Sequence, residues 1–340
     1  MLSVPWQIPP CDEVDLVFEY NDASEKIYSS VFSELELLKN EVGAFKIEKG
    51  VDQWKLAVSS ADTKLNMPLT LSQPINRAYY KLVEIIRTCI IQPVKNSFHM
   101  CEAPGGFVQA VFHEFQKTIK DLDCTSMIGY NHPCFSPILS RNGVNIHQFE
   151  NNDITDPNIR RMHVTKLGKN RYELITADGA IDNDVSPETV ELDNAQLLAS
   201  EIALAIELQK NDGCFVVKVF ALQYSITYEL ICILAYMYKN VQIVKPFTSR
   251  SVNDERYVIC QGFDITKKLN MSLDQTKYLS KACNMKSMWL QEMSDISIQF
   301  ANQQTSFLRK ALLYNEKNAR NKGRGRGRGI GRGRQRQQPY

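Results

Sequence analysis

The sequence predicts an α/β fold built on one mostly parallel sheet with helices on both of its faces. Two observations lead to this prediction. From residue 97 onward, short apolar strands alternate with helical stretches, and a glycine-rich turn follows the first of these strands. Of the 340 residues, 44% are hydrophobic and 23% are charged, which is ordinary for a soluble globular protein. This composition excludes wholesale disorder, a collagen-like fibre and a coiled coil.

Two helices are expected before the first strand. Residues 25–42 carry apolar side chains at helical spacing, and residues 74–91 begin at a proline and continue as an amphipathic stripe. The residues between them, 44–70, are assigned as a short hairpin or loops. The expected strands are 97–101, 125–130, 144–148, 172–177, 214–220, 241–245 and 256–261, and the helical stretches among them are 105–119, 157–165, 188–211 and 225–238.

The last of these strands is expected to run antiparallel to the others. Only about ten residues separate it from the preceding strand. A crossover helix between parallel strands needs more chain than that. We therefore expect a seven-stranded sheet with one antiparallel strand near its edge.

The charges divide the chain unevenly. Residues 317–340 are rich in arginine and glycine and contain nine Lys and Arg but no acid, whereas the other 316 residues carry 31 bases and 38 acids. A basic end of this kind favours a polyanionic partner such as nucleic acid. The expected segments are an N-terminal, partly helical extension (1–73), the α/β domain (74–265), a helical segment (266–316) and a disordered tail (317–340).

Several classes of protein are excluded by what the sequence lacks. The longest apolar run, 230–238, is far short of the roughly 20 residues that a membrane span needs. The first ten residues have no basic stretch followed by an apolar core, and the nine cysteines include no C-x-x-C pair. The five histidines show no metal-ligand spacing. We expect an intracellular protein with reduced thiols, without a membrane or metal partner, in either nucleus or cytoplasm.

The glycine-rich turn has the features of a cofactor site. It reads Cys101-Glu102-Ala103-Pro104-Gly105-Gly106-Phe107 and opens a helix. Adjacent glycines allow a ligand to approach the backbone closely, and a helix amino terminus supplies free N–H groups. The turn is neither G-x-G-x-x-G nor a Walker A loop, and by itself it is equally typical of a plain strand-to-helix turn. The whole string resembles motif I of the FtsJ-like RNA 2′-O-methyltransferases, where it cradles S-adenosylmethionine.

This resemblance implies a Rossmann-like methyltransferase fold with a catalytic Lys-Asp-Lys-Glu tetrad. Lys81 lies in the helix before the first strand, Asp178 follows the fourth strand, and Lys218 lies in the fifth. Glu255 leads into the last strand. Ligands of open α/β sheets bind at the carboxyl ends of the strands, and an antiparallel last strand begins at that same edge. Any one of these residues could be an ordinary surface or capping residue, but together they are expected to form one cleft.

The resemblance covers about residues 74–263 and is closest to the cap-specific mRNA 2′-O-methyltransferases of eukaryotes and viruses. Three stretches favour that branch: 152–155, 245–250 and 253–258. The site residues that the resemblance implies are Glu102, Ala103, Pro104, Gly105, Gly106, Phe107, Asp153 and Asp178 for the cofactor, and Arg77, Arg250 and Asn253 for the substrate.

Two departures from the family pattern bear on the substrate. After the second strand, residues 129–132 contain no acid to hold the cofactor ribose, which argues mildly against the bacterial rRNA branch. After Lys218, Ala221 stands where cap enzymes are expected to have an aspartate. That substitution puts one contact near the substrate in doubt.

The expected function is transfer of a methyl group from S-adenosylmethionine to the ribose 2′-OH of the first transcribed nucleotide of m7G-capped mRNA. DNA lacks this hydroxyl, so RNA is the expected partner, with other capping or transcription components as further candidates. A second lysine nearby and partial burial are expected to push Lys218 toward its neutral form. The alternatives are an rRNA or tRNA ribose methyltransferase, and a catalytically silent RNA-binding capping subunit.

Overall fold

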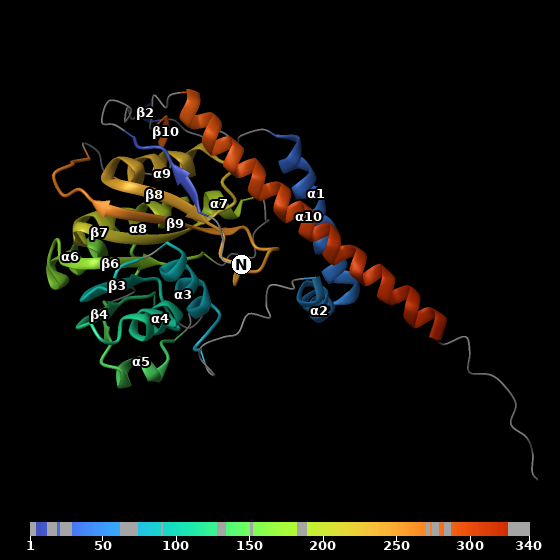
Figure 1. Ribbon diagram of the computed structural model, residues 1–340, viewed down its shortest axis with the longest axis horizontal. Coiled ribbons are helices and arrows are strands. Elements are labelled where there is room, and N and C mark those ends of the chain that lie inside the picture. Colours follow the sequence, from blue (N-terminus) through green and yellow to red (C-terminus); the bar gives the residue numbers. More distant parts are fainter. Residues whose placement is uncertain are drawn as a thin grey trace, which may run out of the picture.

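A single eight-stranded sheet lies at the centre of the molecule, and helices cover both of its faces (Figure 1). This computed structural model describes residues 5–11, 19–20, 29–61, 74–89, 91–127, 134–149, 152–181, 189–269, 273, 279–281 and 287–325. The strand order is β1-β8-β9-β7-β6-β3-β4-β5. The strands are β1 (Trp6–Ile8), β3 (Asn96–Met100), β4 (Asp121–Cys124), β5 (Asn145–Ile146), β6 (Tyr172–Ala177), β7 (Gln209–Phe220), β8 (Tyr238–Val244) and β9 (Glu255–Phe263).

The directions of the strands confirm the expected mixed sheet. The β3, β4, β5, β6 and β7 strands pair in parallel, and β9 is antiparallel to both β7 and β8. The eighth strand, β1, was not expected. It pairs antiparallel with β8 at the edge of the sheet, with Trp6 opposite Ile243. Three residues are too few to show a strand pattern in the sequence.

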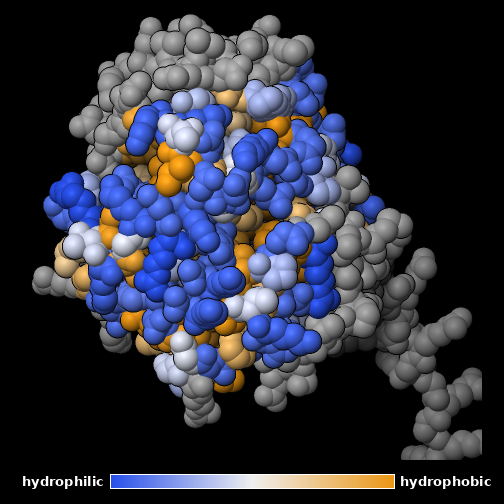
Figure 2. Space-filling view, turned by 60° about the vertical axis from the view of Figure 1, so that its left-hand side comes forward, coloured by the Kyte–Doolittle hydropathy of each residue, from blue (hydrophilic) through white to orange (hydrophobic). Residues whose placement is uncertain are grey.

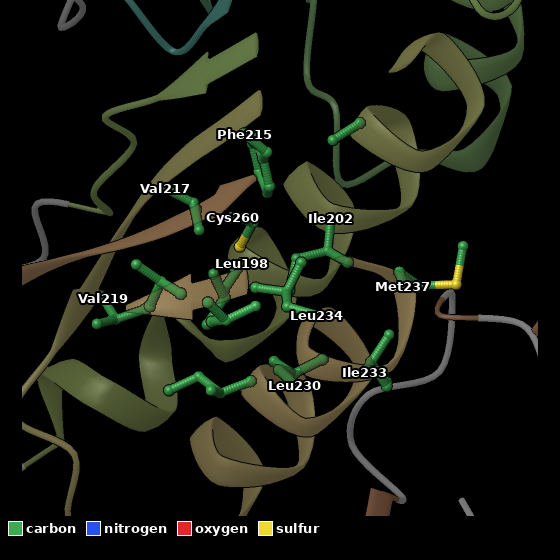
Figure 3. Close-up of a cluster of buried hydrophobic side chains, with 14 of the residues drawn as sticks. Leu198, Ile202, Phe215, Val217, Val219, Leu230, Ile233, Leu234, Met237 and Cys260 are labelled. Carbon is green, nitrogen blue, oxygen red and sulfur yellow. The ribbon is translucent and has the colours of Figure 1, made fainter. Parts of the chain in front are cut away.

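Each face of the sheet has its own apolar core. Leu174 and Val216 face α3 (Ala78–Thr88), α4 (Gly106–Phe115) and α5 (Pro137–Arg141). Their strand neighbours Ile175 and Val217 face the opposite core, because successive side chains of a strand point to opposite faces. Figure 3 shows this second core, where side chains of β7 and β9 meet those of α8 (Ala195–Leu208) and α9 (Ser225–Met237). On the same face lies α6 (Pro157–Leu167), and α7 (Val190–Asp193) precedes α8.

One expected strand was misplaced along the chain. The sequence predicted it at 125–130, but β4 spans Asp121–Cys124. The misleading residue is Asp123, a charged side chain that is buried in the strand. It accepts a hydrogen bond from the Tyr172 hydroxyl at 2.9 Å and lies 2.6 Å from His147 Nε2. These partners satisfy a carboxylate that reads as exposed in the sequence.

The hairpin or loops expected at 44–70 were also wrong over the described residues, because this stretch is helical up to Ala61. The first helix, α1 (Ser30–Lys49), is followed at once by α2 (Val51–Ala61). Trp54, Ala57 and Val58 of α2 are buried at helical spacing, so the helix has an apolar face. Residues 62–73 lie outside the described residues.

The α1 and α2 helices pack against α10 (Ser287–Gly325), a long helix that runs along one side of the body in Figure 1. We call α1, α2 and α10 the helical layer. It has a third core, which includes Phe32, Leu35, Trp54, Leu308 and Ala311. Helix α10 continues to Gly325, into the segment expected to be disordered, and residues 326–340 lie outside the described residues.

The helical layer contacts the loop between β8 and β9, residues 245–254, which we call the β8–β9 loop. Lys39 Nζ of α1 lies 2.8 Å from Asp254 Oδ2, and Gln304 Nε2 of α10 donates to the Val252 carbonyl at 2.8 Å. Just beyond the loop, the Arg256 guanidinium stacks over the Phe300 ring of α10 at 4.5 Å. The layer therefore holds the backbone on both sides of Glu255.

A small two-stranded sheet, β2 (Glu19–Tyr20) with β10 (Leu279–Lys281), completes the described elements. The face seen in Figure 2 is mostly hydrophilic, with small scattered hydrophobic patches. Among the described residues, no helix is both long and apolar enough to cross a bilayer.

Candidate active site

The four expected catalytic residues come together at the carboxyl edge of the parallel strands, as two lysine–carboxylate pairs. Lys81 Nζ lies 2.8 Å from Glu255 Oε1 and donates to Oε2 at 3.0 Å. Lys218 Nζ donates to the Asp178 carbonyl at 2.8 Å and lies 3.3 Å from Asp178 Oδ1. The pairing of β7 with β9 explains the convergence, because it sets Phe220 opposite Glu255 at this edge.

The charge state of Lys218 differs from the expectation. We expected burial and a second lysine to lower its pKa. Burial does act in that direction, but the charges of Asp178, Glu255 and Glu201 outweigh it and raise the pKa of Lys218 above its usual value. Lys81 is engaged by Glu255, so three carboxylates and not the second lysine govern the charge on Lys218.

Glu255 is held firmly in its ionised form. The residue is only 8% exposed, and burial alone would raise its pKa. The charges of Lys81 and Lys245, with hydrogen bonds from Lys81 and Ser249, lower the pKa to about 2. The Ser249 hydroxyl donates to Glu255 Oε1 at 2.5 Å. Such partners fix both the charge and the orientation of this carboxylate.

Two further residues of the site were not assigned a role from the sequence, although both lie in stretches that suggested the cap branch. The Tyr257 hydroxyl donates to Asp178 Oδ1 at 2.9 Å, and Tyr257 pairs with Lys218 across the β7–β9 ladder. Lys245 Nζ donates to the carbonyls of Asn253 and Glu255, at 2.6 and 2.8 Å. Burial, with Arg256 nearby, lowers the pKa of Lys245 well below its usual value. Tyr257 therefore helps to orient Asp178, and Lys245 helps to hold the backbone that carries Glu255.

The three residues expected to bind substrate all lie at or beside the β8–β9 loop. Arg250 is exposed and Asn253 is half-buried. Arg77 donates to the Thr248 carbonyl at 2.9 Å, so one of its contacts holds the loop itself. Glu84, one helical turn after Lys81, accepts hydrogen bonds from the backbone of the same loop. Helix α3 and the residue before it therefore carry both Lys81 and the two residues that anchor the loop.

The two glycines of the turn are required by packing within the protein. Gly105 has a left-handed backbone, with φ of 113°, and a Cβ there would collide with the Leu139 side chain of α5. A Cβ on Gly106 would collide with the Asn76 side chain and lie 2.9 Å from the Tyr79 backbone nitrogen. We expected these positions to be open for a ligand. The space that a Cβ would fill is taken by neighbouring protein atoms, while the approach of a ligand to the backbone of the turn stays a prediction.

Glu102 occupies part of the helix terminus that we expected to be free. Its Oε1 accepts hydrogen bonds from the backbone N–H groups of Phe107 (2.6 Å) and Val108 (3.3 Å). Burial, then the nearby charge of Asp178, raises the pKa of Glu102 well above its usual value. Asp178, close enough to act electrostatically on Glu102, is the acidic group at this edge that suits a cationic ligand. S-adenosylmethionine, the cofactor of this family, carries such cations in its sulfonium and ammonium groups.

The third part of the expected cofactor site lies after β5. Asp153 Oδ1 accepts hydrogen bonds from the Thr155 backbone N–H (2.9 Å) and hydroxyl (2.7 Å). Its neighbour Asn152, with a positive φ of 55°, donates to the Thr125 hydroxyl at 2.7 Å and to the Ser126 carbonyl at 2.6 Å. These bonds fix the segment to the end of β4. Residues 129–132, where an acid is lacking, lie outside the described residues.

Ala221, the other departure from the family pattern, lies beside the tetrad. Its backbone has a positive φ of 44°, and its N–H donates to the Asp254 carbonyl at 3.1 Å. Within the described part of the chain, no group of three or more His, Cys, Asp or Glu side chains is arranged to hold a metal ion.

The chain is similar to several methyltransferases, two of which are named for an RNA substrate. It is 27% identical over 289 residues to the cap-specific mRNA (nucleoside-2′-O-)-methyltransferase 2 of Drosophila melanogaster. This match covers 76% of this chain but only 40% of the fly protein. It is 29% identical over 210 residues to a tRNA 2′-O-methyltransferase of Schizosaccharomyces pombe, covering 60% of this chain and 70% of that protein. A probable methyltransferase of African swine fever virus is 22% identical to this chain over 298 residues. That match covers 76% of this chain and 67% of the viral protein.

The sequence model described as FtsJ-like methyltransferase matches residues 74–263, more than half of the chain. These residues contain the glycine-rich turn, both lysine–carboxylate pairs and the β8–β9 loop. The helical layer lies outside the match. The chain therefore belongs to the FtsJ-like methyltransferase family.

Proposed function

We propose that this chain is an S-adenosylmethionine-dependent RNA methyltransferase that modifies the ribose 2′-OH of the first transcribed nucleotide of m7G-capped mRNA. The observation that carries the proposal is the pair of lysine–carboxylate contacts at one sheet edge, Lys81 with Glu255 and Lys218 with Asp178. A ribose hydroxyl placed there would meet a hydrogen-bond donor with a fixed direction. Positioning of this kind accounts for much of the rate of a bimolecular transfer.

The proposed roles follow from the contacts. Lys218 Nζ binds the 2′-hydroxyl oxygen, and Asp178 fixes the direction of that amine. Glu255 holds Lys81 in place and, with Ser249, closes the other side of the site. When bound, S-adenosylmethionine supplies a methyl group already activated by its sulfonium.

Proton transfer depends on the charge of Lys218. In the state described here its pKa is raised, so its ammonium orients the hydroxyl and cannot accept a proton. A cation bound beside Asp178 would offset the field of that carboxylate and lower the pKa of Lys218 toward the range of a base. We therefore propose that Lys218 accepts the 2′-OH proton only when the cofactor site is filled.

Capped mRNA is favoured over other RNA by the fly relative, whose name includes that substrate, and by the stretches 245–250 and 253–258. A tRNA substrate is the second candidate, because the yeast tRNA enzyme is 29% identical to this chain. A silent RNA-binding subunit would have no need of two intact lysine–carboxylate pairs.

The test offers tritiated S-adenosylmethionine with four RNAs: an m7G-capped transcript, the same transcript uncapped, structured rRNA and unmodified tRNA. We expect label only in the capped transcript, released on digestion as a 2′-O-methylated first nucleotide. Label in tRNA or rRNA would replace the cap assignment by the second candidate. If no RNA is labelled although the cofactor binds, the remaining hypothesis is the catalytically silent RNA-binding subunit.

A further inference from the structure

A third carboxylate lies beneath the Lys218–Asp178 pair. Glu201 comes from α8, in the helix layer behind the sheet, and is only 1% exposed. Its Oε1 fills the space beside Gly179, the residue after Asp178, where a Cβ would collide with that oxygen. In the same place a Cβ would lie 3.2 Å from the Cys101 Cβ. Glu201 therefore packs directly under the backbone that carries Asp178.

Glu201 and Lys218 also share a small cavity. The space in it that is open to the centre of a water molecule is about 10 Å³, at the lower limit for holding one water, and Gly179, Leu198 and Phe220 also line it. The carboxyl of Glu201 interacts with the Cys101 thiol and the Gly179 backbone N–H, but its Oε1 makes no well-formed hydrogen bond with any described residue. A buried carboxyl oxygen that is only weakly satisfied is costly to a protein, so its retention calls for an explanation. Among the described residues that line the cavity, Lys218 is the cation, and Leu198, which is labelled in Figure 3, is part of its apolar lining.

We propose that Glu201 is a positioning residue of this site, whose charge acts on the Lys218 ammonium from the α8 side while its side chain supports the Gly179 backbone. The inference rests on the proposed role of Lys218 in methyl transfer. It assigns to Glu201 no contact with substrate or cofactor. Its effect passes through Lys218 and the Asp178 loop alone.

The electrostatics agree with this geometry. Burial raises the pKa of Glu201 to about 8, and the nearby charge of Lys218 opposes that rise. The other titratable groups that act on Lys218 or Glu201 are Asp178, Glu255, Cys101 and Glu102. Glu201 is therefore poised to change charge near neutral pH, next to a lysine whose charge decides its role.

The direct test measures the pKa of Lys218 by NMR titration of protein labelled with ¹³C at the lysine ε-carbon, with Lys218→Arg to assign its signal. We expect Glu201→Gln to lower the pKa of Lys218 by about one unit, because one of three attracting carboxylates is lost. Glu201→Met, of similar length and uncharged, should lower it too and replaces Gln if that variant fails to fold. An unchanged pKa of Lys218 in either folded variant would overturn the proposal.

The matched control is Glu191→Gln. Glu191 is also buried and lines the same cavity, but its carboxylate accepts hydrogen bonds from Gln223, Tyr224 and Thr227 at the start of α9. We expect no shift of the pKa of Lys218 in this control. An equal shift in both variants would mean that any loss of buried charge acts on Lys218, which would contradict a specific role for Glu201.

Methyl transfer adds an independent readout. The limb of the pH–rate profile governed by Lys218 should move to lower pH in Glu201→Gln, by the same amount as the NMR titration. If the wild type transfers no methyl group to any RNA, the proposed function fails while the NMR result still decides on Glu201. If transfer occurs but the NMR titration does not shift, the inference on Glu201 fails alone.

Discussion

We call the sheet edge where the Lys81–Glu255 and Lys218–Asp178 pairs meet the site edge. The site edge and the helical layer are both assembled from distant parts of the chain, but by opposite kinds of interaction. The site edge is held by buried charges, with Lys81 and Lys218 each paired to a carboxylate. The helical layer is held by apolar side chains such as Leu35 and Leu308. Charges in the wrong place would destabilise a fold, whereas apolar helices can pack on many surfaces. The site is therefore the more specific of the two, and the layer the more adaptable.

The largest effect should come from the site edge. We expect Lys218→Ala to lower the rate of methyl transfer by about a thousandfold or more, since the proposed donor to the 2′-hydroxyl is lost. Cofactor binding and the fold should persist. Lys210→Ala is the control, because Lys210 lies on the same strand in an exposed pair with Glu173. A Lys218→Ala enzyme with more than a few per cent of wild-type turnover would contradict the assignment.

In the helical layer, packing should dominate. Leu35 is 1% exposed, so Leu35→Ala should lower the free energy of unfolding of the layer by about 2–5 kcal/mol. Leu37 is on the same helix but 64% exposed, and Leu37→Ala should change this free energy of unfolding by less than about 0.5 kcal/mol. Urea denaturation followed by circular dichroism measures both. Equal effects of the two variants would show that α1 does not pack as described.

Acid should weaken the site edge and spare the layer. The folded-state pKa of Glu255 is about 2, below its usual value near 4.5, so its stabilising contribution is present above pH 4.5 and is lost as the pH falls toward 2. We expect Glu255→Gln to remove this part of the pH dependence, on the order of 3 kcal/mol. Unfolding free energies at pH 7, 4 and 2.5 give the comparison. Parallel curves for the variant and the wild type would exclude the ion pair with Lys81.

The contact between the two regions should matter less. Lys39 and Asp254 are only 12% and 18% exposed, and we expect Lys39→Met to cost about 1–3 kcal/mol and to lower turnover modestly by loosening the β8–β9 loop. Lys55→Met removes a pair that is 62% and 93% exposed and should have no effect. Turnover at saturating RNA is the measurement. A normal rate in Lys39→Met would mean that the layer does not steady the site.

The smallest effect on turnover should come from truncation after Gly325, which spares α10 and removes five arginines. RNA affinity should fall, and the salt dependence should flatten by up to about 3 in log–log slope. Capped and uncapped transcripts should be affected alike, because a Gly/Arg segment forms no defined pocket. Filter binding across a salt series tests this. An unchanged slope would show that the tail is not an RNA-binding arm.

The sequence predicted the α/β body far better than the flanking regions, for physical reasons. Strand β6 was placed at its observed bounds, because Tyr172–Ala177 is a mostly apolar, mostly buried strand. The four residues of the predicted tetrad were named by a resemblance, and the pairing of strands at the sheet edge explains why they lie close together. The partners of α1 were not found, since its buried side chains do not specify which apolar helix will cover them.

Within the site, the sequence missed residues that act through others. Glu201 lies in a helical stretch where a glutamate is normally exposed, and only the packing under Gly179 reveals its burial. The pKa direction of Lys218 was wrong because the number of carboxylates around it depends on tertiary structure. Gly105 and Gly106 were singled out for ligand approach, which stays a prediction, and the packing that leaves no room for a Cβ at either position was not foreseen.

The pairing of α1 with α10 also has a consequence for how the protein is made. About 240 residues separate the end of α1 from the start of α10. A ribosome adds about 5–20 residues per second, so α1 emerges about 10–50 s before the helix that covers it. During that interval Phe32 and Leu35 lack the α10 side chains that cover them in the folded protein, so the nascent chain exposes apolar surface to which a chaperone can bind. The contact of Lys39 with Asp254 depends on α1 being packed against α10. We therefore expect a chain that terminates before α10 to have a poorly ordered β8–β9 loop.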